Sequence, residues 1–201
     1  MNFDVIKTNL EKRGFTVSMF ETAGEASSYL NTVIHGKTVG FGGSITLQDM
    51  GLYESLSQNN TCFWHWRDKD GMAVAELRAK GNAAEIYLSS VNGIAESGEI
   101  INIDGTCNRV AAMLYGHEKV YLVVGKNKIA ENYEAALWRA RNVAAPKNAH
   151  RLGVNTPCAE KGERCYDCAS NGRICRALAV LWEKPTGADI EVVLIDEALG
   201  Y

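Results

Sequence analysis

Four cysteines stand within eighteen residues of one another in the spacing C-x6-C-x2-C-x6-C: Cys158, Cys165, Cys168 and Cys175. Deprotonated cysteines bind zinc tetrahedrally, and they also hold iron–sulfur clusters. The short central pair supplies two ligands from one turn, and the outer two cysteines can complete the set from either side. The spacing therefore predicts a metal centre held by four thiolates.

The width of this pattern bears on the kind of metal centre. Structural zinc sites more often pair two short C-x-x-C turns, whereas here one such turn is flanked by two longer loops. A wider loop favours a larger group, so we expect an iron–sulfur cluster of the 4Fe–4S type, with zinc as the alternative. Nearby cations would offset the negative charge of either centre: Lys161, Arg164, Arg173 and Arg176.

Composition sets limits on the class of protein. The chain has 201 residues, 46% hydrophobic and 22% charged, with a net charge of -3. These values are typical of a globular domain, and the charge argues against a broad grip on nucleic acid or an anionic membrane. The first residues read as an amphipathic helix without the apolar run of a signal peptide, and no stretch approaches a membrane span. We therefore expect a cytoplasmic protein, where clustered cysteines indicate metal binding before disulfides.

Helical and strand patterns alternate from residue 15 to about residue 145, which predicts an α/β fold with a mainly parallel sheet and flanking helices. Residues 146–176 break the alternation and hold the cysteines. Because strand-like segments follow, this segment reads as a metal-binding loop inserted into a single domain spanning 1–201. Helices are expected at 3–14, 22–34, 46–56, 72–79, 108–115 and 133–143, and strands at 15–20, 39–41, 61–66, 84–88, 100–103, 120–124, 177–182 and 190–195.

A glycine-rich turn follows the strand expected at 39–41. Gly42, Gly43 and Ser44 allow close approach of the backbone to a ligand, and the next helix would present N–H groups to a phosphate or carboxylate. The turn lacks the lysine of a P-loop and the full spacing of a dinucleotide fingerprint. It is equally consistent with a plain tight connection.

Polar side chains stand in loops where parallel α/β sheets bind ligands. Glu96, in the loop expected at 89–99, is the candidate general base or nucleophile, and a solvated loop glutamate is the alternative. Asp104 is placed to cap a helix, and Arg109 to pair with Asp104 or to clamp a carboxylate. Lys126 and Lys128 follow the strongest strand and would attract an anion, or would simply be solvated. The histidines share no metal-ligand or triad spacing, and the tryptophans read as packing residues.

Several of these motifs together resemble a known family. The ordered string is G-F-G-G-S-I-T-L, S-S-V-N-G-I-A-E-S-G-E-I-I-N-I-D-G-T-C-N-R-V-A-A, V-V-G-K-N-K-I, N-A-H-R-L, and then T-P-C with C-x-x-C and R-I-C. It is similar to the LUD-domain (lactate-utilisation) family, in its short form with a C-terminal four-cysteine motif. The resemblance runs from about residue 5 to the end of the chain.

The resemblance implies a fold similar to the ribose-phosphate isomerase, glucosamine-phosphate deaminase and CoA-transferase group. It also implies a role in bacterial oxidation of L-lactate to pyruvate beside iron–sulfur oxidoreductase partner subunits. One departure is Cys107, where the family pattern usually has glycine. The residues that the resemblance places in the cleft are Gly42, Gly43, Ser44, Glu96, Asp104, Asn108, Arg109, Asn127 and Lys128.

Three hypotheses follow. In the first, the protein is an iron–sulfur component of lactate utilisation that binds a small carboxylate or phosphorylated molecule. Arg109 would then hold the carboxylate, Glu96 would help remove a proton, and a partner subunit would supply the acceptor, since no flavin or nicotinamide signature is present. In the second, it is a metabolite-binding or assembly subunit with a structural zinc or cluster. In the third, it is an enzyme similar to CoA-transferases or sugar-phosphate isomerases. A homo-oligomer is compatible with all three.

Overall fold

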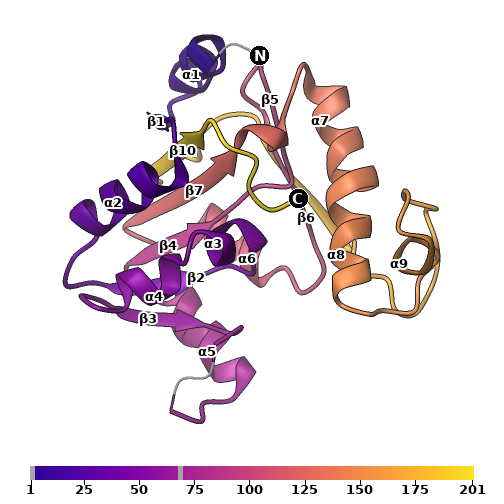
Figure 1. Cartoon of the computed structure of the whole chain (residues 1–201), viewed down its shortest axis with the longest axis horizontal. Helices are drawn as coiled ribbons and strands as arrows, with labels where there is room; N and C mark the ends of the chain where they lie inside the picture. The colour runs from indigo at the N-terminus through magenta and orange to yellow at the C-terminus, as the bar shows by residue number, and fades with distance from the viewer. Residues whose placement is uncertain (1–2, 68–69) are drawn as a thin grey trace.

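A six-stranded sheet forms the centre of the molecule (Figure 1), in a computed structural model that describes residues 3–67 and 70–201. Its strand order is β1-β10-β7-β4-β2-β3, and every neighbouring pair is parallel. The α/β fold with a mainly parallel sheet is thus confirmed. The strands are β1 (Thr16–Phe20), β2 (Thr38–Phe41), β3 (Thr61–Trp64), β4 (Ile86–Ser89), β7 (Lys119–Gly125) and β10 (Ile190–Ile195).

A second, four-stranded sheet has the order β8-β5-β6-β9. Here β6 is antiparallel to both of its neighbours, and β5 is parallel to β8. The sequence predicted one alternating series and a continuous loop over 89–99, but β5 lies within that loop. The two closing strands also separate, because β9 joins this sheet and β10 joins the first. The strands are β5 (Gly93–Ala95), β6 (Ile100–Asp104), β8 (Ile129–Ala130) and β9 (Ala177–Leu181).

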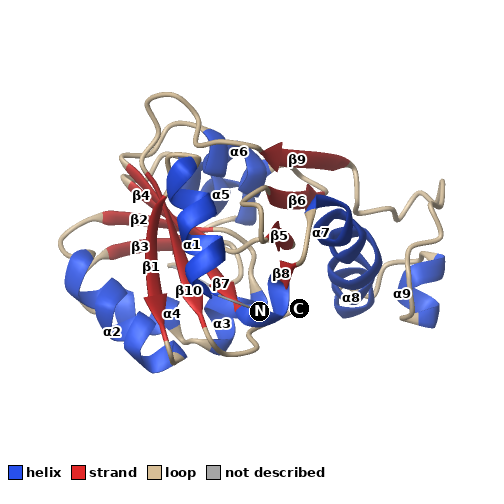
Figure 2. Ribbon diagram, turned by 90° about the horizontal axis from the view of Figure 1, so that it is seen from above, coloured by secondary structure: helices blue, strands red, loops and turns tan. Residues whose placement is uncertain are grey.

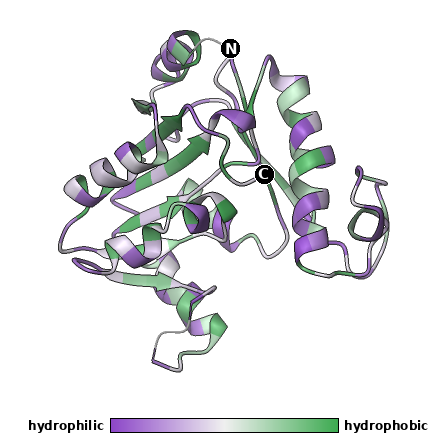
Figure 3. Cartoon of the chain, in the orientation of Figure 1, coloured by the Kyte–Doolittle hydropathy of each residue, from purple (hydrophilic) through white to green (hydrophobic). Residues whose placement is uncertain are grey.

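Helices cover both faces of the large sheet (Figure 2). Leu122 and Val192 enter one buried cluster, and the next residues along, Val123 and Val193, enter another. Because both faces of β7 and β10 are buried, these strands read as continuous apolar runs, and Figure 3 colours their ribbons mostly green, for hydrophobic. The covering helices are α1 (Phe3–Lys12), α2 (Ala23–Val33), α3 (Ile45–Asp49), α4 (Leu52–Leu56), α5 (Val74–Asn82) and α6 (Asn108–Leu114).

Local signals explain where α2 begins and where α3 is separated from α4. The Thr22 hydroxyl accepts a hydrogen bond from the Glu25 N–H at 3.2 Å, and the Glu25 carboxylate accepts one from the Thr22 N–H at 3.3 Å. This capping box starts α2, as the sequence predicted. The single helix expected over 46–56 is instead divided into α3 and α4, because Gly51 takes a left-handed conformation with φ 60°.

A long continuous helix covers the second sheet. It consists of α7 (Tyr133–Arg139), the π-helical segment η2 (Ala140–Ala144) and α8 (Ala145–Arg151). The sequence predicted its end near residue 143, but it continues past Pro146. The wider π turn ends two residues before this proline, which has no N–H to donate. Ala136 and Ala140 pack against the second sheet, and no helix of the described residues is long and apolar enough to cross a membrane.

The segment after this helix lies at one side of the molecule (Figure 1). A short helix, α9 (Pro157–Lys161), packs on α8, and residues 162–176 then run without a helix or strand until β9. The cysteine segment, residues 157–176, therefore lies beside α8, with Cys158 in α9 and the other three cysteines of the pattern in the loop that follows.

Close packing at Gly40 of β2 gives a test of this architecture. An added Cβ at Gly40 would lie 2.1 Å from the carbonyl oxygen of Gly81, in α5. That oxygen belongs to the backbone and cannot turn away, so Gly40→Ala should lower the free energy of unfolding by about 1–3 kcal/mol, as overpacking usually does. Urea denaturation measures the loss. Gly24→Ala in α2 is the control, because its nearest neighbour is Thr22 Oγ1 at 3.9 Å, and an equal loss in both variants would refute the packing argument.

Candidate functional site

A polar cavity of about 220 Å³ opens at the carboxyl ends of the parallel strands. Gly43 and Ser44 follow β2, Trp66 follows β3, and Ser90 and Asn92 follow β4. The turn after β6 and the last turns of α8 close the other side. The carboxyl edge of a parallel sheet is where α/β proteins usually bind ligands, so we take this cavity as the candidate site.

The structure brings six of the nine residues expected in the cleft to this cavity: Gly43, Ser44, Asp104, Asn108, Arg109 and Lys128. Gly42 and Asn127 are not among the residues that line it. A Cβ on Gly42 would stand 2.9 Å from the Cγ of Arg109, so this glycine makes room for the arginine stem. The Asn127 side chain accepts from the Leu199 N–H at 3.0 Å and donates to the Gly200 carbonyl at 3.2 Å, which ties down the chain after β10.

Glu96 is not among the residues that line the cavity. Its N–H donates to the Ala130 carbonyl at 2.8 Å, and its own carbonyl accepts from the Asn9 amide of α1 at 2.8 Å. The backbone around Glu96 therefore joins the second sheet to the first helix. Its catalytic role stays a prediction, and Glu96 does not line the cavity in which a substrate would bind.

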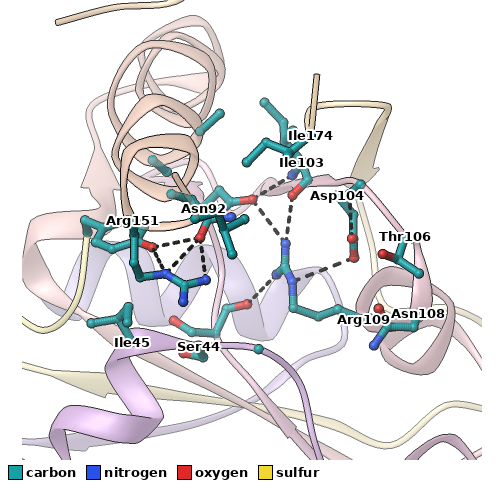
Figure 4. Close-up of a pocket in the computed structure, with 18 of the residues that line it drawn as sticks. Ser44, Ile45, Asn92, Ile103, Asp104, Thr106, Asn108, Arg109, Arg151 and Ile174 are labelled. Carbon is teal, nitrogen blue, oxygen red and sulfur yellow. Dashed lines mark hydrogen bonds and ion pairs between the residues drawn. The ribbon is translucent and has the colours of Figure 1, made fainter. Parts of the chain in front are cut away.

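Arg109 lies at the centre of the cavity wall (Figure 4). Its Nη1 donates to the Ser90 carbonyl at 3.1 Å and to Asn102 Oδ1, and its Nη2 donates to Asn92 Oδ1 at 3.2 Å and to the Ile103 carbonyl at 2.9 Å. The four N–H groups of the two terminal nitrogens are thus committed to protein oxygens. A bidentate clamp on a substrate carboxylate would have to break these bonds, so Arg109 contributes charge and rigidity more than a free binding fork.

Asp104 caps α6, as the sequence predicted. Its Oδ1 accepts from the N–H groups of Gly105 at 2.7 Å and Cys107 at 3.1 Å, and its Oδ2 accepts from Val110 at 3.1 Å. The same carboxylate lies 3.8 Å from Arg109 Nε, which confirms the predicted pair. Cys107 has φ 65°, in the left-handed region that glycine adopts most easily. The glycine usual in the family pattern at this position therefore has a structural reason.

Lys128 is a buried cation at the cavity edge, only 4% exposed. Its Nζ donates to the Thr46 hydroxyl at 2.8 Å and to the Ser90 hydroxyl at 2.9 Å. Burial, followed by the positive charges of Arg139 and Arg109, lowers the pKa of Lys128 to about 7. A substantial fraction of this amine is therefore neutral at physiological pH.

Sequence reasoning missed several residues of the cavity wall. The Arg151 guanidinium lies 4.4 Å from the centroid of the Trp66 ring and donates to Asn148 Oδ1 at 2.8 Å (Figure 4). Asn148 and Arg151 are three residues apart on one helix, so they share a face. That spacing within N-A-H-R-L was the available signal, but it required knowing that the helix continues beyond residue 143.

Two further missed residues are Arg78 and His65. The Arg78 Nε is buried and has no hydrogen-bond partner among residues 3–67 and 70–201. Burial, with the nearby Arg78 charge, lowers the pKa of His65 to about 4, so this imidazole is neutral at pH 7. A buried donor without a partner normally indicates that something else satisfies it.

Charge in this cavity is unbalanced. Of the described residues that line it, four carry cationic side chains, Arg78, Arg109, Lys128 and Arg151, and one carries a carboxylate, Asp104. Asparagine, serine and threonine side chains fill much of the remaining wall. Such a surface attracts small anions such as carboxylates and phosphates.

The structure also brings the four cysteines of the sequence pattern around one small second cavity, together with Arg141 and Arg173. Arg141 Nη2 lies 3.8 Å from Cys165 Sγ. Arg173 donates to the carbonyls of Cys168 at 2.8 Å and Cys175 at 3.0 Å, and so holds the segment closed. Within the described part of the chain, no group of three or more His, Cys, Asp or Glu side chains is arranged to hold a metal ion.

The two cavities share part of their walls. Ala145 of α8 and Ile174 of the cysteine segment line both of them. The contact is close, because a Cβ on Gly105 would stand 2.6 Å from the Ile174 carbonyl oxygen. The cysteine segment is therefore packed directly against the turn that carries Asp104.

Comparison with known proteins identifies a family and a similar fold. The model of the LUD domain matches residues 3–195. A DUF162 family protein from Deinococcus radiodurans is 13% identical, with a TM-score of 0.54 over 96% of this chain and 94% of that one, which shows a shared fold. A structure of eIF2B beta from Chaetomium thermophilum, also 13% identical, has a TM-score of 0.36 over 56% of this chain and 44% of that one, too low to support an argument. No curated protein matches the chain.

The hydrogen bonds of Arg109 give a testable consequence for stability. Arg109→Met would leave the oxygens of Asn92, Asn102 and two backbone carbonyls without their donor, and Asp104 without its counter-charge. We expect a loss of about 3–5 kcal/mol in the free energy of unfolding, the usual cost of breaking a buried charged network. Lys80→Met, which removes an exposed pair with Glu76, should change it by less than about 0.5 kcal/mol. Similar stabilities for the two variants in urea denaturation would contradict this role.

Proposed function

Because the chain belongs to the LUD domain family, which is associated with lactate utilisation, we propose that it is an iron–sulfur component of the oxidation of lactate to pyruvate. The substrate carboxylate would bind in the cationic cavity, and the cluster would be held by the four cysteines. The observation that carries the proposal is the shared wall, since Ala145 and Ile174 line both cavities. Family and fold alone would not define a reaction.

The carboxylate would be bound chiefly by Arg78 and Arg151. Arg109 already donates to four protein oxygens, and the lowered pKa of Lys128, about 7, weakens its average charge. Arg78 keeps a buried Nε for which the described residues offer no acceptor. Arg151 is exposed beside Trp66, and its hydrogen bonds to Asn148 and Tyr201 use its Nε and Nη2, which leaves Nη1 for a ligand. These two arginines are the groups that gain most from an incoming anion.

The donor set of the second cavity suits an iron–sulfur cluster. Cys158, Cys165, Cys168 and Cys175 line one space, and thiolates are the usual ligands of such clusters, which transfer single electrons when bound. Arg141 and Arg173 would offset the negative charge. The space is narrow, about 10 Å³, so a cluster would displace the segment outward, and residues 162–176 hold no helix or strand that must unfold for this to happen.

Proximity is what would connect the two sites. A group in the cationic cavity and a group among the cysteines would be separated by one layer of side chains, that of Ala145 and Ile174. The oxidation of lactate to pyruvate releases two electrons and two protons, and a redox partner subunit, docked where the cysteine segment lies at the side of the molecule, would supply the acceptor for the electrons. This arrangement supports an oxidation component better than a purely structural metal loop.

Metal content tests whether the four cysteines hold an iron–sulfur cluster. Protein purified without oxygen should contain iron and acid-labile sulfide and should absorb visible light, and Cys165→Ser should lose most of both, because one ligand of the cluster is gone. Cys107→Ser is the control, since Cys107 lies in the turn before α6, outside the cysteine segment. A colourless wild-type protein that contains zinc instead would refute the iron–sulfur assignment.

A negative charge added to the cationic cavity tests whether the substrate carboxylate binds there. Ser44 caps α3, accepting from the Leu47 N–H at 3.3 Å, and lines the cavity. Ser44→Asp keeps a capping side chain but adds a negative charge, so affinity for lactate or pyruvate should fall at least about tenfold. Thr22→Asp makes the same kind of change at the exposed start of α2 and should leave the affinity unchanged. Calorimetry at low salt measures both, and equal affinities would show that the anion binds elsewhere.

A further inference from the structure

The environment of Lys128 is unusual for a buried lysine. Buried lysines are normally paired with a carboxylate, but the hydrogen bonds of Lys128 Nζ go to two neutral hydroxyls, those of Thr46 and Ser90. Both hydroxyls are themselves committed as donors. Thr46 donates to the Leu199 carbonyl at 3.2 Å, and Ser90 donates to the Val123 carbonyl at 2.6 Å. Each hydroxyl oxygen is therefore left as an acceptor toward the amine.

This arrangement matches a neutral amine. A neutral primary amine has two N–H donors and one lone pair, whereas an ammonium group has three donors and none. Thr46 and Ser90 accept the two donors, and the lone pair is then left for the cavity, which Lys128 lines. The third N–H of an ammonium group would have no acceptor, because among the described residues Nζ hydrogen-bonds to Thr46 and Ser90 alone.

The charges around Lys128 favour the same state. Arg139 of the long helix and Arg109 of α6 repel a positive charge on the amine, and the exposed Asp49 of α3 opposes them weakly. Of the other charged or titratable groups that line the cavity, Arg78 and Arg151 are cationic and His65 is neutral at pH 7. Asp104 is occupied by Arg109 and the start of α6, and burial raises the pKa of the Tyr201 phenol, which therefore stays neutral. Cationic neighbours and desolvation are the two means by which proteins produce nucleophilic lysines.

We propose that Lys128 forms a reversible imine with the keto carbon of a 2-oxo acid, of which pyruvate is the smallest common example, bound in the cationic cavity. The inference deepens the proposed function and rests on it in one respect, because it needs the cavity to bind the carboxylate of that acid. Lys128 would bond covalently to the keto carbon of the ligand, and the arginines would hold its carboxylate.

The step balances without any oxidant or reductant. The lone pair of Nζ forms a bond to the keto carbon, and the carbonyl oxygen takes up a proton while the nitrogen loses one, which gives a carbinolamine. The carbinolamine then loses its hydroxyl group together with the remaining nitrogen proton as one molecule of water, and the nitrogen forms the double bond to carbon. Addition of water reverses the sequence and releases the 2-oxo acid.

Reductive trapping tests the proposal. Holoprotein would be incubated with pyruvate and borohydride, and its intact mass and peptide masses measured. We expect an increase equal to one reduced pyruvate adduct, located on Lys128. Because the amine must be deprotonated and its pKa lies at about 7, the yield should be low near pH 6 and should rise toward pH 8. An adduct spread over surface lysines, or a yield independent of pH in this range, would overturn the assignment.

Matched variants complete the test. Lys128→Met should lose the adduct, while Lys126→Met, which changes an exposed lysine paired with Asp196 at 3.0 Å, should keep it. Lys128→Arg retains a cation without a nucleophile and should also lose the adduct, which covers the case in which the methionine variant does not fold. The same yield in wild type and in a folded Lys128 variant would disprove the imine.

Pyruvate binding measured by calorimetry without borohydride separates this inference from the proposed function. Binding without any adduct would overturn the imine and leave the carboxylate site intact. An adduct in protein that holds no iron would support the imine and refute the iron–sulfur assignment. Absence of both binding and adduct would refute the carboxylate site and the imine together.

Discussion

One buried guanidinium, that of Arg109, connects the two sheets of the molecule. It donates to the Ser90 carbonyl just after β4 of the large sheet and to Asn102 and Ile103 in β6 of the second sheet. A buried charge needs such partners, and the loss of any one is costly. The position of the second sheet relative to the first, and with it the shape of the cavity between them, therefore depends on this side chain.

The four cations of the cavity are consequently unequal. Arg109 serves the fold, and Lys128 is held by hydroxyls in a desolvated position that lowers its pKa. Only Arg78 and Arg151 combine a full charge with access to a ligand. The cavity thus contains an amine that can be neutral and arginines that always carry a charge. One layer of side chains separates these groups from the cysteine segment.

The sequence predicted the parts of the fold whose hydrophobic run is long or whose hydrogen bonds join residues close together in the chain. The apolar run from 120 to 124 is buried on both faces, and the Thr22 capping box and the Asp104 cap form within a few residues. The second sheet was missed because β5 and β8 are three and two residues long, too short to show a strand period. Arg78 and Arg151 were missed because they reach the cavity from helices distant in the chain, which only tertiary structure brings together.

The place of β10 between β1 and β7 has a consequence for how the protein is made. In the part of the chain that the structure describes, β1 pairs in the sheet with β10 alone, so β1 has no neighbour until about 170 further residues have been synthesised. Its unpaired edge is then exposed to other chains, and a chaperone that covers the nascent N-terminal segment would be of particular use to this fold.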